Sequence, residues 1–107
     1  MTTVVIDAGI CGFITKVEVV RLSARRVSVA LDSDCEVVSQ IAEQIRELNW
    51  QDTLRERENS LVYKSALQCV KHAACPVYVA IIKAVEVEVG VALPRDVVIH
   101  FETVDGK

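Results

Sequence analysis

Three of the four cysteines in the chain stand where a thiol can do chemistry. Cys11 lies in a turn between Gly9 and Gly12, and glycine lets a backbone adopt positive φ values and leaves the sulfur uncrowded. Cys35 and Cys75 each stand at the expected start of a helix, where unpaired N–H groups and partial positive charge stabilise thiolate. Because thiolate is the form that binds metals and attacks electrophiles, these residues are candidate ligands or nucleophiles.

The three cysteines form a candidate site for a soft metal centre, because thiolates select iron–sulfur clusters and zinc over hard cations. Three sulfurs leave one coordination position open on a tetrahedral ion or on an iron of a cluster. His72 is the histidine that we place in this site. Cys69, Asp34, a water, a substrate or a partner protein are the other candidates for the open position.

Two other functions are compatible with the same residues. The first is a sulfur-transfer or redox protein with Cys35 or Cys75 as nucleophile and His72 as base. The second is an interaction domain with incidental cysteines, since free cysteine is among the most commonly buried residues. Cys69 fits this structural role best because it lies inside an expected helix. The pattern as a whole favours a binding protein over an enzyme.

Length and composition predict one domain, residues 1–107, in the cytoplasm. Half of the residues are apolar and the formal net charge is -3, so we expect no nucleic-acid partner. The chain contains no run of about 18 apolar residues, so we expect no membrane span. The N-terminus lacks the basic and apolar regions of a signal peptide. In a reducing compartment, cysteines are more often metal-binding, catalytic or buried than disulfide-bonded.

The first elements expected along the chain, which must position the cysteines, are strands. Short β-branched or alternating segments predict strands at 3–6, 14–20 and 27–31. Short connections between them favour antiparallel pairing. The alternating segment 96–102, which follows Pro94, predicts a last strand. This strand and the segment VEVEV offer a sheet edge or an apolar patch, so a homo-oligomer is an open possibility.

Helices are expected between the third strand and the last. Ser33 and Glu36 have capping-box spacing, and apolar residues recur at helical intervals from Val37 to Leu48. Residues 49–60 predict a loop or a short helix.

A further helix, capped by Asn59 or Ser60, is expected to run through Val70. Pro76 at the first helical position and Gly90 at the end predict the final helix. The order of elements predicts an α+β fold, an antiparallel sheet packed on one face by helices.

The layout of the cysteines over residues 10–89 resembles the iron–sulfur cluster scaffold proteins of the IscU type, equivalent to the N-terminal domain of NifU. That family carries Cys-Gly-Asp before a strand, a cysteine at a strand-to-helix junction and a His-Cys pair before a long helix. The resemblance implies an IscU/NifU-like fold, a cluster held by Cys11, Cys35 and Cys75, and protein partners in cluster or sulfur transfer. The chain also resembles small proteins from anaerobic prokaryotes, of no established activity, that share AGICGF, SDC and ACPV.

Two departures from the scaffold pattern change the expected function. Phe13 stands where the family has an aspartate that helps make the cluster labile, and phenylalanine can neither ligate nor exchange. We therefore predict a stable cluster carrier rather than a fast-transferring scaffold. His72 lies three residues before Cys75 rather than next to it, and it shares a face with Cys75 only if that segment is helical.

Overall fold

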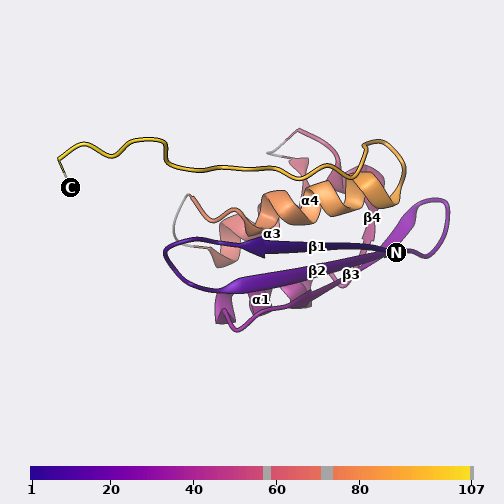
Figure 1. Ribbon diagram of the computed structural model, residues 1–107. Coiled ribbons are helices and arrows are strands. Elements are labelled where there is room, and N and C mark those ends of the chain that lie inside the picture. The colour runs from indigo at the N-terminus through magenta and orange to yellow at the C-terminus, as the bar shows by residue number, and fades with distance from the viewer. Residues whose placement is uncertain (57–58, 71–73, 107) are drawn as a thin grey trace.

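A computed structural model describes residues 1–56, 59–70 and 74–106 (Figure 1). In this part of the chain, four strands form one antiparallel sheet in the order β1-β2-β3-β4. The strands are β1 (Thr2–Asp7), β2 (Ile14–Arg21), β3 (Arg26–Asp32) and β4 (Glu47–Asn49). The helices are α1 (Glu36–Gln44), α2 (Trp50–Thr53), α3 (Leu61–Cys69) and α4 (Val77–Glu88). The α+β fold predicted from the sequence is confirmed.

The sheet buries one face, as the alternation in the sequence predicts. On β2, Thr15, Val17 and Val19 are buried, whereas Lys16 on the opposite face is exposed. Val17 lies opposite Val4 of β1 and Leu31 of β3 in the antiparallel register. Since successive side chains of a strand point to opposite faces, this register places every buried β2 residue in the same layer as the helices.

Helix α4 covers β1 and β2, and α1 packs against β3. The α4 residues that face the core recur at helical spacing, and they are Val77, Ala80, Ile81, Ala84 and Val85. They belong to one core with Val38 and Ile41 of α1 and Val62 of α3. The helices therefore share a single apolar layer with the sheet.

The C-terminal end of α4 confirms the predicted glycine stop. Gly90 has φ +84°, which is costly for residues with a Cβ. Its N–H donates to the carbonyl of Val87 at 3.1 Å, and the N–H of Val91 donates to the carbonyl of Glu86 at 3.0 Å. This pair of bonds is a Schellman motif, which satisfies the last carbonyls of the helix. The segment VEVEV is accordingly helical up to Glu88 despite its alternation.

The predicted capping box at the start of α1 is wrong. The N-cap is Cys35, and no side chain caps the helix. The Ser33 hydroxyl instead accepts hydrogen bonds from the Thr15 hydroxyl and from the N–H of Cys35. The apolar pattern also outlasts the helix, which ends at Gln44. Leu48 lies on β4, where it is buried opposite Val27 of β3.

The start of α4 and the last strand differ from the prediction, whereas the start of α3 agrees with it. Pro76 is the N-cap of α4 rather than its first helical residue. Of the two predicted caps of α3, Asn59 and Ser60, Ser60 is the N-cap, and its hydroxyl accepts from the N–H of Tyr63. Residues 96–102 are not a strand. They are extended and exposed, because no strand of the described chain lies beside them to complete their backbone hydrogen bonds.

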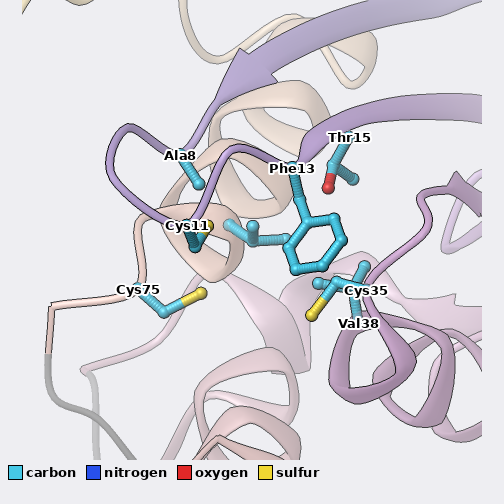
Figure 2. Close-up of a pocket in the computed structure, with 8 residues that line it drawn as sticks. Ala8, Cys11, Phe13, Thr15, Cys35, Val38 and Cys75 are labelled. Atoms are coloured by element: carbon cyan, nitrogen blue, oxygen red, sulfur yellow. The ribbon is translucent and has the colours of Figure 1, made fainter.

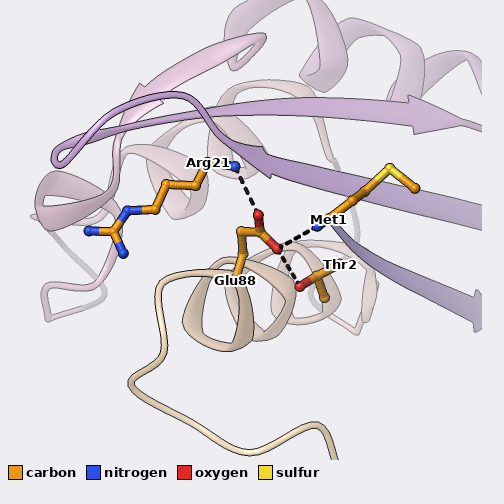
Figure 3. Close-up of polar contacts among 4 residues, drawn as sticks. All are labelled: Met1, Thr2, Arg21 and Glu88. Atoms are coloured by element: carbon orange, nitrogen blue, oxygen red, sulfur yellow. Dashed lines mark hydrogen bonds and ion pairs between the residues drawn. The ribbon is translucent and has the colours of Figure 1, made fainter.

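Glu88 fastens the end of α4 to the first two strands (Figure 3). One carboxylate oxygen accepts from the Thr2 hydroxyl at 2.7 Å and lies 3.4 Å from the Met1 ammonium. The other accepts from the backbone N–H of Arg21 at 2.9 Å. Burial acts to raise the pKa of Glu88, but these hydrogen bonds and the ammonium outweigh it, so the pKa is lowered.

We expect Glu88→Gln to lower the free energy of unfolding at neutral pH by about 1 kcal/mol, because the amide weakens three charge-assisted contacts. The Glu88 pKa is lower in the folded than in the unfolded chain. Its stabilisation is therefore complete above the ordinary carboxyl pKa and lost as the pH falls through the folded value. Urea unfolding at several pH values should show a shallower acid dependence for the variant. Glu86→Gln, on the same helix, is the control, and an equal loss in both variants would contradict this role.

Candidate functional site

A small pocket lies at the end of the sheet where β1 connects to β2 (Figure 2). Its volume is about 100 Å³. The residues that line it come from three separate stretches of the chain, and they are Ala8, Cys11, Phe13 and Thr15, then Cys35 and Val38, and then Cys75 and Val77. The fold therefore brings together at one pocket the three cysteines that are candidate ligands.

Cys11 is presented by a tight turn between β1 and β2. The N–H of Gly12 donates to the carbonyl of Gly9 at 2.9 Å, and the Asp7 carboxylate accepts from the N–H of Gly9 at 3.0 Å. Gly9 and Gly12 have φ values of +86° and +75°, which other L-residues adopt only with strain. The turn leaves Cys11 exposed at the mouth of the pocket.

Cys35 is held where β3 ends and α1 begins. Its carbonyl accepts the first helical hydrogen bond, from the N–H of Ser39 at 3.1 Å. Its own N–H donates to the Ser33 hydroxyl at 3.2 Å, and that hydroxyl also accepts from Thr15 at 2.9 Å. Because Thr15 is buried on β2, this chain of hydrogen bonds fixes the start of α1 against the central strands. Cys35 is half-buried in this position.

Cys75 directly precedes Pro76, the N-cap of α4, and is half-buried. Val77, the next residue, is buried and anchors the helix start in the core. In Figure 2, the side chains of Cys75 and Cys35 point toward one another across the pocket. Two helix N-termini thus meet at one pocket, and both contribute partial positive charge there.

Phe13 gives the pocket an apolar wall. Its ring lies between the β1–β2 turn and Cys35 in Figure 2, and the residue is 39% exposed. Ala8, Val38 and Val77 add further apolar surface around the sulfurs. The ring is therefore placed to limit the access of water to the thiols.

The other candidates for a ligand do not line this pocket. Cys69 is buried at the end of α3, and Asp34 is exposed beside α1. His72 lies outside the described residues. Sequence reasoning missed Thr15 and Ser33, which position Cys35. The signal for Thr15 was present, because it falls on the buried face of an alternating strand.

The donor types at the pocket suit a soft metal centre, because all three are free thiols. Over residues 1–56, 59–70 and 74–106, no group of three or more His, Cys, Asp or Glu is arranged to hold a metal ion. Zinc–sulfur bonds are about 2.3 Å long, so three ligands of one ion must lie close together.

A family model matches residues 2–101, which include the whole pocket and most of the C-terminal segment. The chain belongs to DUF6951, a family of unknown function. No curated protein matches the chain, and no solved structure matches it. Within the described ranges of this DUF6951 protein, no helix is long and apolar enough to cross a membrane.

The exposure of the four thiols predicts their order of alkylation in the reduced, metal-free protein. We expect Cys11 to react first, Cys35 and Cys75 next, and Cys69 at least about tenfold more slowly than Cys11, because Cys69 reacts only when α3 opens. Peptide mass spectrometry after brief treatment with iodoacetamide measures each rate. Treatment in urea is the control and should remove the differences. Equal rates for Cys11 and Cys69 in the folded protein would contradict the structure.

Proposed function

We propose that this DUF6951 protein is a metal-binding protein that holds an iron–sulfur cluster, or zinc, through Cys11, Cys35 and Cys75. The observation that supports the proposal most strongly is the convergence of these three thiols on one pocket. They come from a turn and two helix starts that are far apart in the sequence. An interaction domain with incidental cysteines gives no reason for this convergence.

The starts of two helices lie at the pocket. Cys35 is the N-cap of α1, and Cys75 is adjacent to the N-cap of α4. Partial positive charge at a helix N-terminus stabilises an adjacent thiolate. Three thiolates in one small pocket repel each other, and a bound metal centre offsets that repulsion with its own positive charge.

The apolar wall supports stable holding over rapid transfer. A hydrophobic shell around a metal site controls the access of solvent. Phe13 supplies this shell at the mouth of the pocket, where an aspartate would supply an exchangeable oxygen ligand. A stable carrier is therefore the form of the proposal that we favour.

Binding requires the three sulfurs to lie close around one metal centre. Cys11 is the exposed member of the three, and its turn is joined to β1 and β2 only at its ends. The left-handed glycines at Gly9 and Gly12 allow this turn to adjust without straining a Cβ. His72, a water or a partner protein fills the remaining coordination position in this proposal.

The cellular setting that we propose follows from the thiols. A reducing compartment, the cytoplasm, keeps free cysteines available to a metal. Proteins that supply iron and sulfide, or that accept a cluster, are the partners that the proposal implies.

Metal analysis of single-cysteine variants tests the ligand set. We expect anaerobically reconstituted wild-type protein to hold iron and sulfide, or zinc, in stoichiometric amount. Cys11→Ala, Cys35→Ala and Cys75→Ala should each lose most of the metal, because a site with two thiolates binds far more weakly. Iron, sulfide and zinc assays together with the visible spectrum measure the outcome.

Cys69→Ala is the matched control and should keep its metal, because its thiol is buried outside the pocket. Unchanged metal content in the three pocket variants would contradict the proposal, as would wild-type protein that binds none of these elements. A thiol-transfer activity that needs only Cys35 or Cys75, without metal, would establish the alternative function.

Phe13 provides a second test. We expect Phe13→Asp to speed the loss of a reconstituted cluster to a chelator by about tenfold or more, since it replaces an apolar cover with an oxygen ligand. Loss of visible absorbance over time measures the rate. Phe13→Leu, which keeps an apolar side chain, is the control. An unchanged rate of cluster loss in Phe13→Asp would contradict the proposal that Phe13 helps to retain the cluster.

A further inference from the structure

The C-terminal segment after α4 carries apolar side chains that its own chain leaves in solvent. Leu93, Ile99 and Phe101 are 87%, 88% and 89% exposed. Val97, Val98 and Val104 are exposed as well. No hydrogen bond joins residues 93–102 to any other part of the described chain. A row of large exposed apolar side chains of this kind marks an interaction site.

The path of this segment keeps it away from the sheet. In Figure 1 the segment runs back along the outer side of α4 and projects beyond the end of the molecule. The molecule measures 51 × 28 × 25 Å, and its radius of gyration is 14.1 Å. A compact chain of this length has a radius of gyration of about 13 Å. The described part of the chain leaves the apolar residues at the projecting end uncovered.

Residues 97–101 have the pattern of a half-buried strand. Val97, Ile99 and Phe101 fall on one side of an extended chain, and Val98 and His100 fall on the other. β-branched and aromatic residues are the preferred strand formers. A segment of this type becomes a stable strand only when a neighbouring strand completes its backbone hydrogen bonds.

The same chain offers the matching edge. β1 is an end strand of the sheet, and no strand of the described chain pairs with its outer side. Over its six residues it contains no proline or lysine, the residues that usually guard an exposed edge. Val4 and Ile6 face the helix layer but are only half-buried, because the apolar layer ends beside them. A further strand would extend that layer.

We propose that residues 97–101 add as a fifth strand to the β1 edge of a second copy of this chain. Each copy has one such segment and one such edge, so a reciprocal exchange closes as a two-fold dimer and leaves neither feature exposed. Val97, Ile99 and Phe101 then continue the apolar layer past Val4 and Ile6. This dimer is independent of metal binding.

Light scattering coupled to size-exclusion chromatography at several protein concentrations tests the dimer. We expect wild-type protein to be a dimer and the double variant Val98→Pro with Ile99→Pro to be a monomer. N–H groups of adjacent residues point to opposite sides of a strand, so one of the two prolines removes a ladder hydrogen bond. Circular dichroism should show an intact fold, since the segment lies outside the core. Thr103→Pro, beyond the strand, is the control and should stay dimeric.

A labelled peptide with the sequence of residues 95–102 tests the edge directly. The monomeric double variant has a free β1 edge, so it should bind this peptide, and a peptide with the two prolines should not bind. A wild-type monomer at all concentrations would overturn the proposal, as would an open polymer or a double variant that remains dimeric. Failure of the peptide to bind the monomeric variant would also overturn it.

Discussion

The packing of α4 across β1 and β2 is the contact on which the rest of the structure depends. Its buried face is entirely aliphatic, and burial of such side chains contributes about 1.5–3 kcal/mol for each large residue. Both ends of the helix are fixed by what they touch. Glu88 binds the first two strands at one end, and Val77 is buried at the other. This position of α4 brings Cys75 to the turn that carries Cys11.

The three thiols of the pocket are held in different ways. Cys35 is tied through Ser33 to the buried Thr15, and Cys75 is adjacent to a helix anchored in the core. Cys11 alone lies on an exposed glycine turn. Under the proposed function, the third ligand comes from this turn, which lies outside the core. The apolar ring of Phe13 lines the same pocket.

The cysteine pocket and the β1 edge differ in what completes them. The cysteine pocket lies at the end of the sheet where β1 leads into β2, and its residues are supplied by one chain. In the described part of the chain, no strand pairs with the outer side of β1, and the C-terminal segment is not part of the sheet. Both features carry backbone groups that need hydrogen-bond partners, and the C-terminal segment also carries apolar side chains that need cover. The proposed pairing of the segment with the β1 edge of a second copy meets both needs.

The sequence by itself determined the features that depend on local pattern. β-branched or alternating segments predicted three strands, Gly90 and the pair Asn59 or Ser60 marked helix ends, and helix-start positions singled out Cys35 and Cys75. Local pattern failed where a contact from elsewhere in the chain decides the outcome. Ser33 caps no helix because Thr15 and Cys35 use its hydroxyl, and Leu48 leaves the helical pattern to pair with β3.

Only the tertiary structure decided that Cys11, Cys35 and Cys75 line one pocket and that Cys69 does not. It also decided that residues 96–102, although they have the composition of a strand, are not one in the single chain. The physical reason is common to both cases. A helix completes most of its hydrogen bonds within itself, but a strand or a shared site exists only when distant segments meet, and sequence spacing does not fix that meeting.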